Sequence, residues 1–230
     1  MHSPPRPLRT RALLTAGLVC VSLSAVLLVL VAVRWSPLMS LDTTVAQALH
    51  RRAVSGPGLV RVSRVLSDRV WDPWAMRALT AVVVAFLWWR GSRLLAGWVA
   101  ATSLLATLVQ QGLKAAVGRE RPRWPDPVAS AQYAAFPSGH VMTAVVTCGL
   151  LLWLLRLHGA RSSVWWGSLA LAVISVAGVS LTRVHLGVHW LSDVLGGALL
   201  GGAVAAFSAA GYTTYAHRSR PTADGRASPL

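Results

Sequence analysis

Three short groups of basic and polar residues interrupt an otherwise apolar chain, and their side chains share one chemistry. The groups are Lys114 with Arg121-Pro122, then Pro137-Ser138-Gly139-His140, then Arg183 with His189 and Asp193. Lysine and arginine bind phosphoryl oxygens, and the free amides that open a helix bind anions. One histidine can act as a nucleophile and another as a proton donor. The residue types therefore indicate a phosphate site.

The composition places this site in an integral membrane protein. Of the 230 residues, 54% are hydrophobic and only 13% are charged, which is more apolar than a single soluble core requires. The net charge is +15, but the basic residues are spread between apolar blocks rather than gathered in one patch. This distribution argues against nucleic-acid binding and favours membrane lipids with anionic headgroups as the counter-charge.

Six apolar blocks predict an all-α, polytopic membrane protein built as a bundle of six transmembrane helices. The blocks cover residues 12–33, 73–89, 94–113, 138–155, 164–182 and 190–215. At 1.5 Å per residue, the first block spans about 33 Å, which crosses a bilayer. It also exceeds the apolar core of about 7–15 residues in a signal peptide, so an uncleaved anchor is favoured. Eight tryptophans near block ends suggest an interfacial belt: Trp71, Trp74, Trp88, Trp89, Trp153, Trp165, Trp166 and Trp190.

The predicted membrane domain covers residues 12–215. We expect a basic cytoplasmic tail over residues 1–11 and a disordered tail over residues 216–230, which are rich in Arg, Ser and Pro. Residues 34–72 form a polar, basic connection that we expect to lie along the membrane surface. Its helical periodicity is carried by Val45, Leu49 and Ala53, and again by Leu59, Val62 and Leu66.

The order of the spans brings the three groups to one face of the membrane. Lys114 follows the third span and Ser138 opens the fourth, so only a connecting loop separates them. Between His140 and Arg183 the chain crosses the membrane twice and returns to the same side. The last span also carries Gly197 and Gly201, a pair suited to close helix packing.

Local spacing supports this convergence. If the third helix continues past Leu113, Lys114 and Arg121 lie within roughly 20° of one azimuth, and Pro122 ends the helix. Ser138 is predicted to be the N-cap of the fourth span, which leaves the next amides free at the positive end of the helix dipole.

The pair His189 and Asp193 has the spacing i,i+4, which predicts a shared helix face where the carboxylate orients the imidazole. Each of the three groups also has a simpler interpretation. Basic residues at span ends are usually interfacial anchors, Pro-Ser-Gly is ordinary helix capping, and an i,i+4 His-Asp pair is often structural. Their combination at one membrane face favours a functional site.

The combined pattern resembles the type 2 phosphatidic acid phosphatase superfamily, membrane lipid phosphatases that share a site with vanadium haloperoxidases. That family's pattern is Lys-x6-Arg-Pro, Pro-Ser-Gly-His and Ser-Arg-x5-His-x3-Asp. The first two motifs are complete here, and Thr182 stands where the third motif has Ser. The motifs span the third to sixth helices, and the architecture agrees over all six.

The resemblance implies two-step phosphoryl transfer. It makes His189 the nucleophile that forms a phosphohistidine, Asp193 the group that orients its ring, and His140 the proton donor to the leaving oxygen. Water then releases phosphate. The substrate phosphate would be held, as charge spreads over its oxygens, by Lys114, Arg121, Ser138, Gly139 and Arg183.

No metal or other cofactor is expected. The carboxylates near the site are Glu120, Asp126 and Asp193, too few for a two-magnesium centre. His185, His189 and Asp193 are spaced four apart and could instead bind zinc, although the charge of the neighbouring Arg183 would oppose a dication.

The sequence therefore predicts a lipid phosphate or pyrophosphate phosphatase of the cell membrane. A lipid phosphotransferase would use the same residues. A haloperoxidase shares the site but needs no membrane spans, and a non-catalytic lipid-phosphate binding or transport protein is the non-enzyme alternative. Basic tails and basic short connections favour cytoplasmic termini and a site on the extracytoplasmic side.

Overall fold

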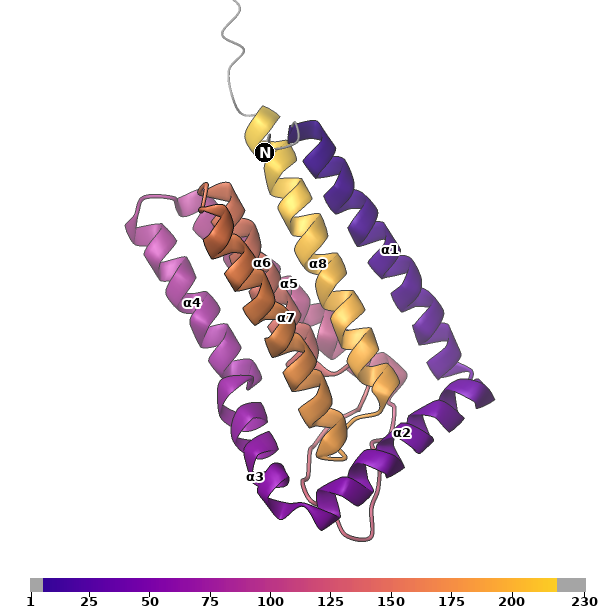
Figure 1. Ribbon diagram of the computed structural model, residues 1–230. Helices are drawn as coiled ribbons and strands as arrows, with labels where there is room; N and C mark the ends of the chain where they lie inside the picture. The colour runs from indigo at the N-terminus through magenta and orange to yellow at the C-terminus, as the bar shows by residue number, and fades with distance from the viewer. Residues whose placement is uncertain (1–5, 219–230) are drawn as a thin grey trace, which may run out of the picture.

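The computed structural model describes residues 6–218, and within that range the chain is helical apart from turns and one long loop (Figure 1). The expected disordered tail lies almost wholly outside the described residues. The helices are α1 (Arg6–Ala32), α2 (Ser36–Ser55), α3 (Pro57–Val65), the π-helix η1 (Leu66–Val70), α4 (Pro73–Trp89), α5 (Arg93–Val117), α6 (Gly139–Leu157), α7 (Ser162–His185) and α8 (Leu191–Arg218).

In the described part of the chain, six segments are long and apolar enough to cross a membrane, which confirms the predicted six-helix bundle. They are Thr10–Ala32, Pro57–Trp89, Arg93–Val117, Gly139–Leu157, Ser162–His185 and Leu191–Ala216. Helix α2 lies across one end of the bundle, and the loop between α5 and α6 is found at that same end (Figure 1). The start of α1 and the end of α8 lie together at the opposite end (Figure 1).

The connection between the first two spans is only partly the surface helix that its pattern predicts. Helix α2 does turn one face inward, but α3 and η1 continue into α4, so the second span starts at Pro57 rather than at Pro73. In α3, Leu59 and Val62 are exposed, and the buried positions are Val60 and Ser63. The expected apolar stripe is therefore wrong here. Because α3 belongs to a membrane span, its apolar side chains can face lipid, and the hydroxyl of Ser63 packs inward.

Trp71 is a second departure from expectation, because it is a core residue rather than part of an interfacial belt. Its side chain is buried between η1 and α7, and a Cβ atom added at Gly178 would lie 2.3 Å from its ring. By contrast, Trp74 and Trp89 are largely exposed. Trp71 thus fixes how η1 packs on α7, the helix whose C-terminal turn carries Arg183.

Helix α6 lies at the centre of the bundle and packs closely against α8. A Cβ atom at Gly197 would lie 2.6 Å from the Ser138 carbonyl oxygen, and one at Gly201 would lie 2.9 Å from that of Met142. The predicted glycine pair therefore marks a real close approach. It brings the start of α6 beside the start of α8, and these two helix ends carry two of the three polar groups.

Candidate active site

The first polar group spans the end of α5 and the loop after it. Helix α5 ends at Val117, because Gly118 adopts φ 58° as a left-handed C-cap. Arg121 therefore lies in the loop, and the expected continuous helix ended by Pro122 is wrong. The two cations still converge. Lys114 Nζ donates to the Ala134 carbonyl at 2.7 Å, and Arg121 donates to the same oxygen at 3.5 Å.

The loop from 118 to 138 wraps around the Arg121 guanidinium and holds it with backbone carbonyls. Arg121 donates to Tyr133 O at 2.9 Å and to Gln132 O at 3.0 Å. From the opposite side it donates to Val188 O at 2.6 Å. Tyr133 adopts φ 67°, a left-handed conformation that is uncommon for a bulky residue. The guanidinium is thus clamped between this loop and the turn before α8.

Ser138 is the N-cap residue of α6, as predicted, but its side chain does not cap the helix. Its backbone amide donates to the Asp193 carbonyl at 2.9 Å, while its Oγ is buried with no hydrogen-bond partner in the described part of the chain. A Cβ atom at the neighbouring Gly139 would lie 2.7 Å from Gln110 Nε2, so the end of the Gln110 side chain would have to move. The first amides of α6 and the hydroxyl of Ser138 are therefore found together at the start of this helix.

His189 lies in the turn between α7 and α8, so it does not share a helix face with Asp193 as expected. The predicted contact nevertheless forms, with His189 Nδ1 3.3 Å from Asp193 Oδ2. The same oxygen accepts the Trp190 amide at 2.9 Å. Asp193 is the third residue of α8 and Trp190 directly precedes the helix, so this contact is half of a capping box. Helix capping, rather than helix periodicity, sets the geometry of the pair.

The partners of His189 define which ring nitrogen is free. A carboxylate only accepts hydrogen bonds, so Nδ1 carries the proton and donates to Asp193. Nε2 then holds a lone pair, and the Arg121 guanidinium donates to it at 3.1 Å. Burial lowers the pKa of His189 well below its usual range, and the charges of Arg183, Arg121 and Lys114 lower it further. The imidazole is therefore neutral, with Nε2 directed at the cations.

Arg183 and His140 complete the cluster. The Arg183 guanidinium donates to Ser67 Oγ at 3.0 Å and lies 3.8 Å from the Asp68 carboxylate, and both of these partners belong to η1. Its Nε is buried, and no hydrogen-bond partner for it is found within residues 6–218. His140, in the first turn of α6, interacts electrostatically with Arg183 and with His189. All three polar groups thus meet at the end of the bundle covered by α2.

Three residues next to this cluster did not stand out in the sequence. Arg119 donates to Asp193 Oδ1 and Ser192 Oγ, each at 2.6 Å, and to Asp42 Oδ2 at 2.7 Å. One sequence signal could have pointed to Asp42. Its spacing of four and eight residues from Ala46 and His50 places an acidic side chain on the buried face of α2. The partner of Asp42 lies 77 residues further along the chain, so no local pattern could identify it.

A stack of aromatic rings supports the turn that carries His189. His50 of α2 stacks on Trp124 with ring centroids 4.0 Å apart, and Trp124 Nε1 donates to Gly187 O at 2.9 Å. Gly187 adopts φ 69°, and a Cβ atom there would lie 2.5 Å from Trp124 Nε1. The turn before α8 therefore depends on glycine for its backbone conformation and for its contact with the loop.

His185 is directed away from the cluster. Its Nδ1 lies 3.1 Å from Ser63 Oγ of α3. Among the side chains that the structure describes, no three from His, Cys, Asp and Glu are grouped as metal ligands. The zinc alternative through His185, His189 and Asp193 therefore lacks a suitable donor set. Thr182, the departure from the family pattern, donates its hydroxyl to Val179 O of its own helix at 3.0 Å.

Comparison with known proteins agrees with this architecture. The family model of the PAP2 superfamily matches residues 95–216, more than half of the chain. The fold is similar to the crystal structure of a transmembrane PAP2-type phosphatidylglycerolphosphate phosphatase from Bacillus subtilis, with a TM-score of 0.76 and 22% sequence identity. The similarity covers 89% of this chain and 98% of that one. A search of curated proteins found no match.

Proposed function

Since the chain belongs to the PAP2 superfamily, we propose that it is a membrane lipid phosphatase that needs no metal and acts through a phosphohistidine. Its substrate is a lipid phosphomonoester or pyrophosphate. The observation that carries the proposal is the neutral, buried His189, whose Nε2 lone pair faces the guanidinium of Arg121. Two buried polar atoms of the same cluster, Ser138 Oγ and Arg183 Nε, have no hydrogen-bond partner among the residues that the structure describes. Buried polar groups almost always have partners, so these two suit a ligand rich in acceptor oxygens.

In the first step, His189 Nε2 attacks phosphorus and the bond from phosphorus to the leaving oxygen breaks. His140 takes up a proton when the bound phosphate offsets the charge of the nearby cations, and it gives this proton to that oxygen, so the lipid alcohol or lipid phosphate leaves in a protonated form. Arg121 donates to Nε2 before substrate binds. When Nε2 turns to phosphorus, this N–H becomes available to a phosphoryl oxygen. One donor thereby holds the nucleophile in place and then stabilises the transition state.

In the second step, water attacks the phosphohistidine and the phosphorus–nitrogen bond breaks. His140, now unprotonated, accepts a proton from this water, and inorganic phosphate leaves. Three cations provide the positive charge that a metal ion supplies in other phosphoryl-transfer enzymes: Lys114, Arg121 and Arg183. Asp193 keeps the proton on Nδ1 throughout, which leaves Nε2 free for each turnover.

The test is phosphate release by the purified protein in detergent against a panel of lipid phosphates and pyrophosphates. We expect activity in excess chelator and inhibition by vanadate, which resembles the transition state. His189→Ala should be almost inactive, and His140→Ala should lose about 10²- to 10⁴-fold, the usual contribution of a proton donor. Phosphate release by His189→Ala at the parental rate would contradict the proposal.

The site is proposed to face the outside of the cell membrane. It lies at the end of the bundle opposite to the start of α1 and the end of α8 (Figure 1). Basic residues near both termini favour the cytoplasmic side for those ends. Membrane lipid phosphates in the outer leaflet are then the accessible substrates.

A further inference from the structure

A chain of hydrogen bonds leads from α2 to the imidazole of His189. Asp42 accepts from Arg119 at 2.7 Å, and Arg119 donates to Asp193 Oδ1 at 2.6 Å. Asp193 Oδ2 in turn contacts His189 Nδ1 at 3.3 Å. Ser192 bridges the middle of this chain, because its hydroxyl accepts from Arg119 and donates to Asp42 at 2.5 Å.

These charges are almost fully removed from solvent. Asp42 is 1% exposed and Asp193 is 0% exposed, and the Arg119 side chain is 11% exposed. One guanidinium thus compensates two buried carboxylates, each of which also has neutral donors. Asp42 accepts the Ser192 amide at 2.9 Å, and Asp193 accepts the Trp190 amide. Removal of one partner from a buried ion pair leaves an uncompensated charge, so Asp42, Arg119 and Asp193 depend on one another.

The network decides which oxygen of Asp193 faces the imidazole. Arg119 occupies Oδ1, so Oδ2 is the oxygen left for His189 and the Trp190 amide. Without Arg119 the carboxylate could rotate or take up a proton, and a protonated oxygen would no longer be an acceptor for Nδ1–H. Asp42 holds Arg119 from the other side, and Met39 Sδ of the same helix lies 3.7 Å from its guanidinium.

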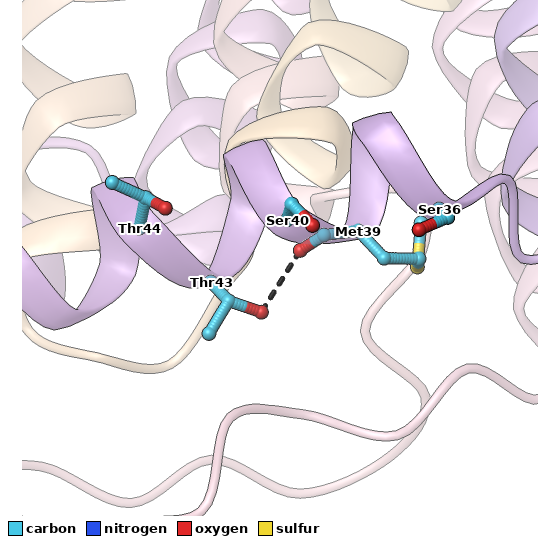
Figure 2. Close-up of a pocket in the computed structure, with 5 residues that line it drawn as sticks. All are labelled: Ser36, Met39, Ser40, Thr43 and Thr44. Carbon is cyan, nitrogen blue, oxygen red and sulfur yellow. Dashed lines mark hydrogen bonds between the residues drawn. The ribbon is translucent and has the colours of Figure 1, made fainter.

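The side chains on the outer side of α2 provide a control position for Asp42 (Figure 2). They line a shallow hollow of about 330 Å³ formed by Ser36, Met39, Ser40, Thr43 and Thr44. Thr43 adjoins Asp42 in sequence, but its hydroxyl donates to the Met39 carbonyl of its own helix at 2.8 Å. A change at Thr43 therefore tests whether disturbance of α2 alone matters.

We propose that Asp42, Arg119 and Ser192 are positioning residues that hold Asp193 as an ionised acceptor and so fix the tautomer and direction of His189. Helix α2 is then a component of the active site as well as a cover for the end of the bundle. The inference rests on the proposed function in one respect, namely that His189 is the nucleophile.

The kinetic test compares Asp42→Asn with the parental protein in detergent, with a lipid phosphate as substrate. We expect kcat to fall about 10- to 100-fold, the range found for outer partners that orient metal-bound histidines. KM should change little, because Asp42 makes no hydrogen bond to the cations that hold phosphate. Arg119→Lys should retain more activity than Arg119→Met, since lysine keeps a charged donor.

Two controls and a coupling measurement separate positioning from folding. Thr43→Ala removes a hydroxyl next to Asp42, and Glu120→Gln removes a charge next to Arg119 that pairs only with Arg123 among the described residues. Both controls should keep parental rates. In an Asp193→Asn background, Asp42→Asn should cause no further loss, because both residues act through the same imidazole. If Asp42→Asn does not fold, Ser192→Ala provides a milder break in the network.

A spectroscopic readout keeps this test independent of turnover. In the ¹⁵N spectrum of labelled histidine side chains, with the signal of His189 identified by His189→Gln, the parental ring should be in the Nδ1–H form. Asp42→Asn should mix the two tautomers. A parental spectrum together with a parental kcat in Asp42→Asn would overturn the inference. If the parental protein released no phosphate at all, the proposed function would fail instead, and the spectra would still decide the role of the network.

Discussion

At the scale of single residues, the central feature is a histidine kept neutral among three cations. Burial and the charges of Arg183, Arg121 and Lys114 all act against a proton on His189 and lower its pKa. A histidine that stays unprotonated remains a nucleophile in acidic solution, because only the neutral ring has a free lone pair on Nε2. In the proposed mechanism, the cations that bind phosphate therefore also keep His189 unprotonated and able to attack.

This arrangement predicts how the rate depends on pH. The active form of His189 is the unprotonated one, so a lowered pKa moves the acid limb of kcat/KM to lower pH. Arg183→Gln removes the neighbouring charge that lowers the pKa of His189 most, so it should move that limb to higher pH, in addition to lowering the maximal rate. Arg156→Gln, which removes a cation at the other end of α6, should leave the limb in place. An unmoved limb in Arg183→Gln would show that its charge does not influence the nucleophile.

A second prediction concerns the hydroxyl of Ser138, which is buried without a hydrogen-bond partner among the described residues. Ser138→Ala removes no hydrogen bond seen in this part of the chain, so its thermal unfolding should be unchanged or occur at higher temperature. Vanadate should bind about 10- to 150-fold more weakly, since a bond to a charged group contributes about 1.5–3 kcal/mol.

The matched control for this prediction is Ser208→Ala. Ser208 bonds Thr102 and Trp98, so its loss should lower stability and leave vanadate inhibition unchanged. A loss of stability in Ser138→Ala without weaker vanadate inhibition would mean that this hydroxyl serves the fold.

At the scale of elements, the site depends on where helices end. Gly118 ends α5 at Val117, three residues after Lys114, and the turn with Gly187 precedes α8. The π-helix η1 directs Ser67 and Asp68 toward Arg183. Loops and helix ends therefore carry most of the site, while the six spans act as the rigid support.

Two of the left-handed glycines, Gly118 and Gly187, allow a direct comparison. Gly118→Ala introduces only backbone strain of about 1–2 kcal/mol, because among the described residues no atom beyond its chain neighbours lies within 4 Å of the added Cβ. Gly187→Ala adds a 2.5 Å contact with Trp124 to the same strain. We expect both variants to unfold at lower temperature, and Gly187→Ala to lose more stability and more of kcat. Equal effects on kcat would indicate that the stack on Trp124 does not position His189.

At the scale of the whole molecule, six spans among the described residues place the start of α1 and the end of α8 at one end of the bundle and the candidate site at the other (Figure 1). Tyr133 provides a probe, since it lies in the loop at the site end and is 84% exposed. Tyr133→Cys should react with a membrane-impermeant thiol reagent in intact cells, and a reporter fused after Leu230 should be cytoplasmic. The parental protein, with Cys20 and Cys148 inside spans, provides the background. Labelling only after permeabilisation would reverse the proposed orientation.

The sequence by itself determined the fold class, the number of spans and the convergence of the three polar groups. Apolar blocks of bilayer length permit little besides membrane helices, and counting crossings is enough to place motifs on one face. The contact between His189 and Asp193 was predicted as well, although capping rather than a shared helix face produces it.

Only the tertiary structure decided how the site is held. The end of α5 at Gly118, the extension of α4 by η1 and the clamp on Arg121 depend on partners far along the chain. The link from Asp42 to Asp193 is the clearest case, because it joins residues from α2, the loop after α5 and α8. Local patterns report which face of a helix is apolar. They do not indicate which buried charged side chains form ion pairs, since that depends on how the helices pack together.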